Sequence, residues 1–243
     1  MNVKLTIEYD GTNYHGWQVQ PNGKTIQEVL EQAIERIVGV KTRLNGSGRT
    51  DAGVHALGQA ANFTCAVDVE PLRFQRGLNA VTPEDIVVKR VEVVPDSFDA
   101  RRDARSRTYR YQIWNYPWPS AVHRHFSWHV PYALNLSAMQ KALRSLEGEH
   151  DFASFQAAGC DAAHSVRKIY HNSLVVKDDV LVYAVEATAY LRHMVRNIVG
   201  TLVEVGCGER TGESFAELLQ VRDRTRAGST APAHGLCLVE VKY

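Results

Sequence analysis

The chain has 243 residues, of which 44% are apolar and 23% are charged. This length predicts one large domain or two small ones, and the composition is that of a folded soluble protein with a substantial core. The net charge is only +1, so the overall charge does not indicate a nucleic-acid partner, and any site for a polyanion must come from local clustering of basic residues.

The cysteines and the N-terminus bear on the cellular compartment. Cys65, Cys160, Cys207 and Cys237 are far apart, and none belongs to a C-x-x-C pair. This spacing disfavours a disulfide framework or a zinc site and favours reduced thiols in a cytoplasmic protein. The N-terminus lacks the apolar region of a signal peptide, and no apolar run is long enough to cross a bilayer, so we expect no membrane partner.

The first half of the chain begins with an alternating strand pattern. Residues 3–9 alternate apolar and polar side chains, which predicts a half-buried strand, and residues 9–23 form a loop punctuated by glycine and proline. Thr25 and Glu28 have the spacing of a capping box before an apolar helical stripe that Gly39 ends. Short strands are expected at residues 41–44 and 86–94.

The second half follows a polar, basic connection at residues 95–106, and we place the domain boundary after residue 100. The pattern then predicts a strand at 107–114 and a helix at 136–146. It also predicts a hairpin of residues 166–176 and 180–190, a helix over 191–203, and a strand at 235–243.

The order of these elements is similar in the two halves: strand, helix, strands, helix, strand. This order predicts an α+β fold of two ferredoxin-like (RRM-like) halves, residues 1–100 and 101–243. Each half is expected to have a mostly antiparallel sheet with helices on one face. No literal sequence repeat relates the halves.

One loop, "GSGRTDAGVHALGQ" from Gly46 to Gln59, has more functional groups than a turn needs. It is not a Walker loop, because no lysine follows the glycines, and Gly48 followed by Gly53 does not give a dinucleotide fingerprint. Asp51 and His55 lack the further ligands that a metal site needs, and His55 is better explained as a structural histidine.

Asp51 has two interpretations. An aspartate in a glycine-rich turn commonly hydrogen-bonds its own backbone. Alternatively, a rigid loop at the end of a strand presents a single carboxylate as a nucleophile or base. In the second case Arg49 is positioned to hold a phosphate or to orient the carboxylate.

Two arginine clusters are candidates for contact with a polyanion. Five arginines between residues 101 and 110 are interleaved with Tyr109 and Tyr111, which suits RNA with bases that stack; the alternative is a solvated charged strand and loop. In "YLRHMVRNIVG", Arg192 and Arg196 flank an apolar helical stripe. A partly buried arginine there needs an acidic partner, whereas the alternative is a surface arginine with a buried stem.

These motifs together resemble the tRNA pseudouridine synthase A family. The loop "GSGRTDAGVHALGQ" is similar to the family's signature, and the blocks "YDGTNYHGWQVQPNGKTIQ", "SRTYRYQIW", "HDFASF", "YLRHMVRNIVG" and "TAPAHGLCL" follow the family's order. The resemblance implies isomerisation of uridine to pseudouridine in the tRNA anticodon stem-loop, at tRNA positions 38, 39 and 40. It also implies two ferredoxin-like halves around a basic active cleft, in a homodimer.

The resemblance also assigns site residues. It implies that Asp51 is the invariant aspartate, that Tyr109 is the active-site tyrosine, and that Arg196 is the arginine that pairs with the aspartate. Tyr109 is also expected to bind the substrate base, while Arg49, Arg101 and Arg102 hold flanking phosphates. The reaction adds no atom and changes no redox state, so we expect no cofactor and no metal.

One segment departs from the family pattern, and two rival functions stay open. The segment "DAAHSVRK", Asp161 to Lys168, replaces a polar stretch of the family that resembles a tRNA-contacting loop. The first rival is a non-catalytic RNA-binding module, which would not need Asp51. The second is a nucleotide-dependent enzyme, against which the missing lysine argues.

Overall fold

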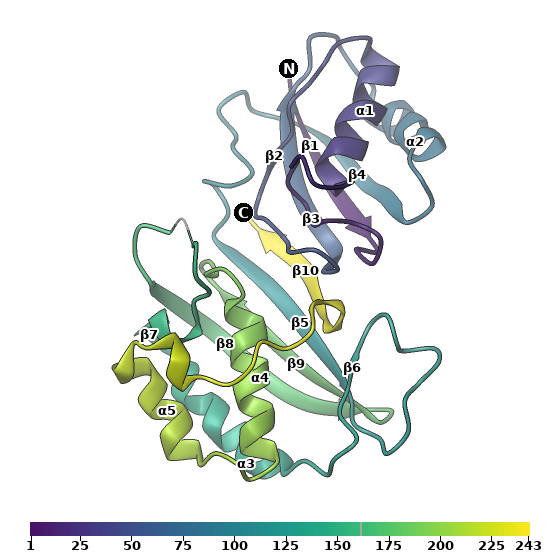
Figure 1. Ribbon diagram of the computed structural model, residues 1–243. Coiled ribbons are helices and arrows are strands. Elements are labelled where there is room, and N and C mark those ends of the chain that lie inside the picture. The colour runs from purple at the N-terminus through teal and green to yellow at the C-terminus, as the bar shows by residue number, and fades with distance from the viewer. Residues whose placement is uncertain (161) are drawn as a thin grey trace. The chain divides into compact units, whose positions relative to one another are not determined.

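The computed structural model describes residues 1–160 and 162–243 (Figure 1). Within these ranges the chain forms an α+β fold in which most strand pairs are antiparallel, as predicted. The chain divides into two compact units: Met1–Arg105 together with Cys237–Tyr243, and Ser106–Leu236. The C-terminal segment therefore belongs to the first unit, although it follows the second in sequence.

The first unit contains β1 (Asn2–Tyr9), α1 (Ile26–Val38), β2 (Asn45–Gly46), β3 (His55–Thr64), α2 (Pro71–Val81) and β4 (Ile86–Val94), with nearly all of β10 (Leu236–Lys242). Its sheet has the order β4-β1-β3-β10. β1 pairs antiparallel with β3 and β4, whereas β10 pairs parallel with β3. The short β2 pairs with β3 outside this order.

The first strand and helix form where the sequence predicts them. Val3, Leu5 and Ile7 of β1 are fully buried and alternate with half-buried polar residues. α1 begins after Thr25, whose hydroxyl accepts the Glu28 N–H at 3.3 Å, and its apolar stripe is buried. The helix ends at Gly39, which has a left-handed φ of 76°.

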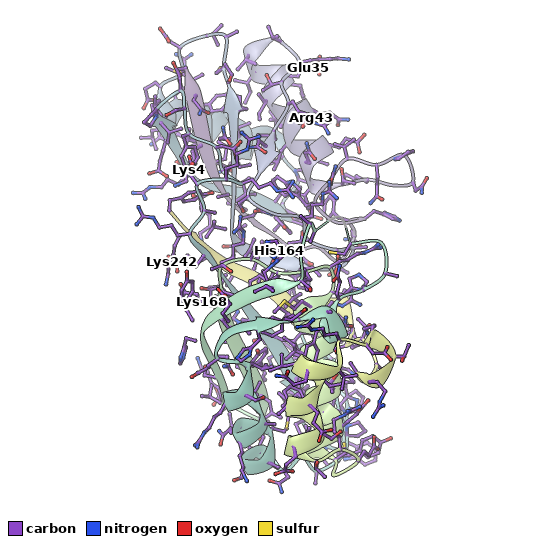
Figure 2. All side chains as sticks on the ribbon, turned by 90° about the vertical axis from the view of Figure 1, so that its left-hand side faces the viewer. Lys4, Glu35, Arg43, His164, Lys168 and Lys242 are labelled. Atoms are coloured by element: carbon purple, nitrogen blue, oxygen red, sulfur yellow. The ribbon has the colours of Figure 1, made fainter. Side chains whose placement is uncertain are left out.

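The opposite face of β1 is covered by the chain terminus. The Lys4 ammonium, labelled in Figure 2, lies 4.5 Å from the centroid of the Tyr243 ring. Lys4 also forms an ion pair with Glu92 of β4 at 3.5 Å, and the Tyr243 hydroxyl donates to the Ala100 carbonyl at 2.9 Å. These contacts fix β10 and the turn around residue 100 to the same unit.

The predicted strand at residues 41–44 is wrong. The Leu44 N–H donates to the Glu31 carboxylate at 2.9 Å, and the Leu44 carbonyl accepts from the Gln27 amide at 3.1 Å. Side chains of α1 therefore satisfy the backbone groups that a strand would have paired, and β2 begins one residue later. The sequence analysis also did not anticipate α2, α5 (Gly212–Val221) or a strand beginning inside the signature loop.

The second unit contains β5 (Ser106–Trp114), β6 (Trp128–His129), α3 (Leu136–Leu143), β7 (Gly148–Asp151), β8 (Val166–Lys177), β9 (Val180–Ala187), α4 (Met194–Gly206) and α5. Its main strands have the order β5-β9-β8-β7 and are antiparallel, and β6 pairs with β5. The predicted hairpin is confirmed as β8 and β9, joined at Asp178 and Asp179 with φ of 49° and 62°. The predicted helix at 136–146 ends as α3 at Leu143 and continues as a 3₁₀ turn to Leu146.

The core of the second unit lies between its sheet and its helices (Figure 1). Tyr111 of β5 and Tyr183 of β9 are opposite each other and fully buried. Ile198, Val199 and Leu202 of α4 are also fully buried. The predicted apolar stripe therefore packs into the core, and α4 begins at Met194 rather than at Leu191.

Candidate active site

The Asp51 carboxylate stands on a tight turn immediately before β3. The Val54 N–H donates to the Asp51 carbonyl at 3.1 Å, and Gly53 takes a left-handed φ of 77°. β3 begins at His55, the residue after Val54. The half-buried Asp51 is therefore held at the start of a buried strand, on a backbone with little freedom.

A second loop, residues 10–17, clamps this turn. The Trp17 N–H donates to the Thr50 carbonyl at 3.1 Å, and the Gly53 N–H donates to the Tyr14 carbonyl at 3.3 Å. The hydroxyls of Tyr9 and Thr50 form a buried hydrogen bond of 2.7 Å. Hydrogen bonds thus fix the backbone on both sides of Asp51.

The glycines of the two loops allow this close packing. A Cβ on Gly11 would lie 2.0 Å from the Val54 carbonyl oxygen, and one on Gly16 would lie 2.5 Å from the Thr50 carbonyl oxygen. On the signature loop, a Cβ on Gly46 would lie 2.5 Å from the indole nitrogen of Trp17. These glycines are needed for contacts within the protein, which is a reason that the sequence analysis did not anticipate.

The glutamine that ends the signature closes the loop. Gln59 is fully buried on β3. Its side-chain oxygen accepts from the Ser47 hydroxyl at 2.7 Å, and its amide donates to the Gly48 carbonyl at 3.1 Å. The start of the motif, at Ser47 and Gly48, is thereby tied to its last residue, and the turn with Asp51 is held between them.

His55, at the start of β3, links the signature loop to loop 10–17. It is 5% exposed, and its Nδ1 lies 3.0 Å from an Asp10 carboxylate oxygen and accepts the Gly11 N–H at 3.1 Å. Burial acts to raise the pKa of Asp10, but hydrogen bonds from Thr12 and the contact with His55 lower it below its ordinary value. These contacts fit the expected structural role of His55. The described residues contain no group of three His, Cys, Asp or Glu side chains that could hold a metal ion.

The predicted phosphate-binding arginines of the first unit are exposed. Arg49 lies on the signature loop, and Arg101 and Arg102 lie on a turn after β4. The Asp99 carboxylate accepts the N–H groups of Arg101 and Arg102 at 2.9 and 2.8 Å. Although burial acts to raise the pKa of Asp99, these bonds and one from Asn45 lower it. The turn is ordered, so both arginines project from a fixed backbone.

Tyr109 lies on β5 in the second unit and is 8% exposed. Its ring meets the ring of Tyr190 edge to face, with centroids 4.9 Å apart. The Tyr190 hydroxyl lies 3.0 Å from the Arg107 carbonyl and 2.8 Å from the Val185 carbonyl, and burial raises its pKa well above the ordinary value. A neutral, fixed Tyr190 thus supports the Tyr109 ring from the side.

Arg196 is half-buried in the first turn of α4. Its Nε donates to the Ala231 carbonyl at 2.8 Å, and the Ala231 N–H donates back to the Arg196 carbonyl at 3.1 Å. The Tyr111 hydroxyl donates to the next carbonyl, that of Pro232, at 2.8 Å. Burial raises the pKa of Tyr111, and the charge of Arg196 opposes that shift. Arg192, by contrast, is exposed and donates to the Ala158 carbonyl at 3.0 Å.

The segment that departs from the family pattern is described from Ala162 onward, and Asp161 lies outside the described residues. The Arg167 guanidinium donates to the His164 carbonyl at 2.9 Å, and the Lys168 ammonium lies 5.6 Å from the centroid of the Tyr170 ring. His164 and Lys168 are labelled in Figure 2.

The predicted residues fall into two groups. Asp51, Arg49, Arg101 and Arg102 belong to the first unit, and Tyr109 and Arg196 belong to the second. The sequence analysis did not single out the residues that support them: loop 10–17, and the segment around Ala231 that accepts from Arg196. The glycines of "YDGTNYHGW" were the signal for the first of these.

A sequence profile described as tRNA pseudouridine synthase matches residues 5–103 and 142–243. The chain is 47% identical to the tRNA pseudouridine synthase A of Acetivibrio thermocellus over 242 residues, which is 100% of this chain and 99% of that protein. The chain belongs to the tRNA pseudouridine synthase family. Members of this family are isomerases.

Further relatives agree. The tRNA pseudouridine synthase A of Geotalea daltonii is 46% identical, with 100% of this chain and 99% of that protein covered. That of Myxococcus xanthus is 47% identical, with 99% of this chain and 91% of that protein covered.

Solved structures are more distant. A crystal structure of the archaeal box H/ACA sRNP Nop10-Cbf5 complex has a TM-score of 0.37 and 12% identity, and the match covers 83% of this chain and 43% of that one. A Cbf5-Nop10-Gar1 complex has a TM-score of 0.39 and 11% identity, with 97% of this chain and 48% of that one covered. The chain thus spans less than half the length of either matched chain. In the part of this protein that the structure describes, every helix is too short or too polar to span a membrane.

We predict that Gly16→Ala unfolds more easily than Gly39→Ala. Both glycines have a left-handed φ, 87° and 76°, but only Gly16 has a carbonyl oxygen 2.5 Å from the added Cβ, whereas Gly39 has nothing within 4 Å. The shared backbone strain costs about 1–2 kcal/mol, and displacing Thr50 adds about 1–3 kcal/mol in Gly16→Ala alone. Urea unfolding measures the difference, and equal stabilities would show that loop 10–17 does not clamp the Asp51 turn.

Proposed function

We propose that this protein isomerises uridine to pseudouridine in the anticodon stem-loop of tRNA, at tRNA positions 38, 39 and 40. The observation that supports the proposal most strongly is a single carboxylate, Asp51, on a turn that a second loop clamps, in a chain of the tRNA pseudouridine synthase family. The N1–C1′ bond breaks, the base turns, and C5 joins C1′; the C5 proton is lost to solvent and N1 takes up a proton. The product is an isomer of the substrate and no redox state changes, so we expect no cofactor and no metal.

Asp51 acts as the nucleophile or base. A reacting group must be held to within a fraction of an ångström, because a misplacement of about 1 Å can cost ~10²-fold in rate. The Thr50 and Asp51 carbonyls and the Gly53 N–H all take part in backbone hydrogen bonds. The backbone that carries the Asp51 carboxylate is therefore held in one place before RNA arrives.

Tyr109 receives the flipped base. Extruding a uridine from the anticodon stem costs a few kcal/mol, and stacking on an aromatic ring recovers about 1–3 kcal/mol per base. The edge contact with Tyr190 supports this role, because it holds the Tyr109 ring in a fixed orientation. The Tyr109 hydroxyl is a candidate to move the proton that leaves C5.

Arg196 keeps Asp51 ionised when RNA excludes water. Desolvation raises the pKa of a carboxylic acid, and a guanidinium within salt-bridge reach opposes that rise. This role requires the two units to bring Arg196 and Asp51 together in the complex with tRNA. The Nε contact with the Ala231 carbonyl supports it, because it gives the guanidinium a fixed orientation.

Exposed arginines hold the RNA backbone. Arg49 stands two residues before Asp51, and Arg101 and Arg102 project from the ordered turn after β4. The slope of log K against log[salt] is negative for such binding. Replacing one of these arginines so that one phosphate contact is lost should make the slope less steep by about 0.7 to 0.9.

The architecture and assembly complete the proposal. Each half is a ferredoxin-like (RRM-like) domain, with the boundary near residue 100 and the active cleft between the halves, and the protein works as a cytoplasmic homodimer. The mostly antiparallel sheet of each unit, with its accompanying helices, supports the ferredoxin-like architecture. The resemblance to the family supports the homodimer.

The function is tested by tritium release. The protein is incubated with tRNA labelled with tritium at uridine C5, without cofactor and with a chelator present. We expect stoichiometric release of tritium and pseudouridine at positions 38, 39 or 40. Tight binding of tRNA without release would instead indicate a non-catalytic RNA-binding module, and release that depends on an added nucleotide would indicate a nucleotide-dependent enzyme.

Two substitutions at Tyr109 separate stacking from proton transfer. Tyr109→Phe keeps the ring and should bind tRNA as the parent does, but lose ~10²–10⁴-fold in single-turnover rate if the hydroxyl moves the C5 proton. Tyr109→Leu should lose about 1–3 kcal/mol of stacking as well. Tyr170→Phe, on β8, is the matched control.

Each outcome for Tyr109 decides a role. A near-parental rate in Tyr109→Phe would remove proton transfer and leave stacking. A near-parental rate and affinity in Tyr109→Leu would remove both, and Tyr109 would then be a core residue of β5.

A further inference from the structure

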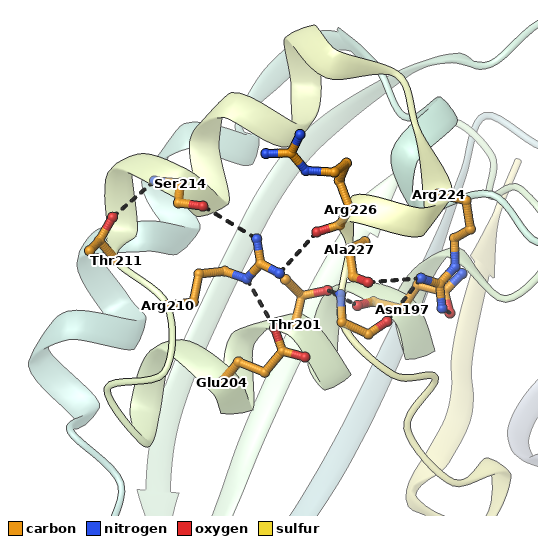
Figure 3. Close-up of polar contacts among 10 residues, drawn as sticks. Asn197, Thr201, Glu204, Arg210, Thr211, Ser214, Arg224, Arg226 and Ala227 are labelled. Atoms are coloured by element: carbon orange, nitrogen blue, oxygen red, sulfur yellow. Dashed lines mark hydrogen bonds and ion pairs between the residues drawn. The ribbon is translucent and has the colours of Figure 1, made fainter.

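A buried asparagine, Asn197, joins α4 to the chain segment that follows α5 (Figure 3). Asn197 is fully buried, and its side-chain oxygen accepts from the Thr230 hydroxyl at 2.7 Å and from the Arg224 guanidinium at 3.1 Å. Its amide group donates to the Phe155 carbonyl at 2.8 Å. Both lone pairs of the oxygen are used, so the orientation of this side chain is determined.

The Arg224 guanidinium donates hydrogen bonds to the residues that follow it in the chain. One terminal nitrogen donates to the carbonyls of Ala227 and Gly228, at 3.2 and 2.9 Å. The other reaches Asn197 and also the Thr230 hydroxyl, at 3.1 Å in each case. A single planar group thus sets the course of residues 227–230.

The same segment packs directly on the backbone of α4. A Cβ on Gly200 would lie 1.7 Å from the Ser229 carbonyl oxygen. The fully buried Thr201 hydroxyl accepts the Gly228 N–H at 3.0 Å. The segment therefore cannot shift along the helix without losing hydrogen bonds between buried groups.

Ala231 and Pro232, which follow this segment, contact Arg196 and Tyr111. The Ala231 carbonyl accepts from the Arg196 Nε and the Pro232 carbonyl accepts from the Tyr111 hydroxyl, each at 2.8 Å. Arg196 and Asn197 are consecutive on α4. The contacts of Asn197 with residues 224 and 230 thus set the position of the acceptor that orients the Arg196 side chain.

We propose that Asn197, Arg224 and Thr230 are positioning residues: they hold the Ala231 carbonyl where it fixes the guanidinium of Arg196. This inference rests on the proposed function of Arg196. None of the three needs to touch RNA for this role. Loosening them should slow the chemical step while tRNA affinity stays the same.

The chain offers a matched control at the other end of α4. Arg210 forms an ion pair with Glu204 of α4 at 3.0 Å, and its guanidinium donates to the Arg226 carbonyl at 2.9 Å (Figure 3). This arginine ties the same segment to the same helix, but its hydrogen bonds do not involve residues 230–232. Its loss should cost stability without turning Arg196.

The experiment compares Thr230→Val, Arg224→Lys and Arg210→Lys in the full chain. We expect Thr230→Val and Arg224→Lys to lower the single-turnover rate of tritium release by about 10- to 100-fold, with tRNA affinity within twofold of the parent. Thr230→Ser, which restores the hydroxyl, should restore the rate. Arg210→Lys should lower the melting temperature but leave the rate unchanged. Rates within twofold of the parent in Thr230→Val and Arg224→Lys would overturn the proposal, as would an equal loss of rate in Arg210→Lys.

A second measurement reads the orientation of Arg196 without activity. The Nε–H resonance of Arg196, assigned as the one lost in Arg196→Lys, should exchange with water faster in Thr230→Val and Arg224→Lys than in the parent and in Arg210→Lys. Equal exchange in all the proteins would overturn the proposal. Faster exchange in a chain whose parent releases no tritium would contradict the proposed function and leave the positioning intact.

Discussion

The close approach of two backbones, loop 10–17 and the Asp51 turn, is the constraint on which the rest of the site depends. Hydrogen bonds from Trp17 and to Tyr14 cross this contact, and it leaves no space for a Cβ at Gly11 or Gly16. A carboxylate on a free loop would sample many positions, and ordering it on substrate binding would cost conformational entropy. Here the backbone of the turn is already ordered when the protein has folded.

The second unit orders its own arginine in a different way. The first unit uses backbone contact between glycine-rich loops, whereas the second uses a buried polar network around Asn197, on a helix whose other buried residues are mostly apolar. Such a network is stabilising only when its members are satisfied, because an unpaired buried polar group costs about 1–3 kcal/mol. Both devices rely on a backbone segment that is distant in sequence: loop 10–17 holds the backbone of the Asp51 turn, and the Ala231 carbonyl accepts from the Arg196 side chain.

The residue before α4 has an unusual conformation. His193 has a φ of 59°, in the left-handed region that glycine favours, and its carbonyl accepts the Asn197 N–H at 2.9 Å. Such a conformation costs on the order of 1–3 kcal/mol and persists where surrounding contacts over-determine it. It turns the chain sharply into α4, so that Arg196 falls in the first turn.

The sequence predicted elements well where periodicity was strong, as in β1, α1 and the hairpin of β8 and β9. It missed α2, whose only buried side chains are Phe74 and Leu78, although Glu70 before Pro71 marks a helix start. The strand at β3 was hidden because it is buried on both faces and includes polar Gln59 and Asn62, so it does not alternate. The failure at β3 has a non-local cause, because contacts distant in sequence bury both faces of this strand and override the local pattern.

The difference between local patterns and contacts distant in sequence also applies to the site. The signature loop identified Asp51, because a motif of that kind is local in sequence. The reason for its glycines was not local, since Gly46 makes room for Trp17 and Gly58 makes room for the Val239 carbonyl, at 2.5 Å from the added Cβ in each case. The Ala231 acceptor of Arg196, 35 residues away in sequence, could not be predicted from spacing either.

The most direct test of the account is the single-turnover release of tritium from C5-labelled tRNA by Asp51→Asn. This substitution keeps the shape of the side chain and removes its charge, and Asp68→Asn, at an exposed carboxylate on the loop after β3, serves as the control. We predict no measurable release by Asp51→Asn, with tRNA affinity within about tenfold of the parent, or ~1.4 kcal/mol, and parental release by Asp68→Asn. Release by Asp51→Asn at even about a tenth of the parental rate, a loss of only ~1.4 kcal/mol in transition-state stabilisation, would contradict the central role of the Asp51 carboxylate.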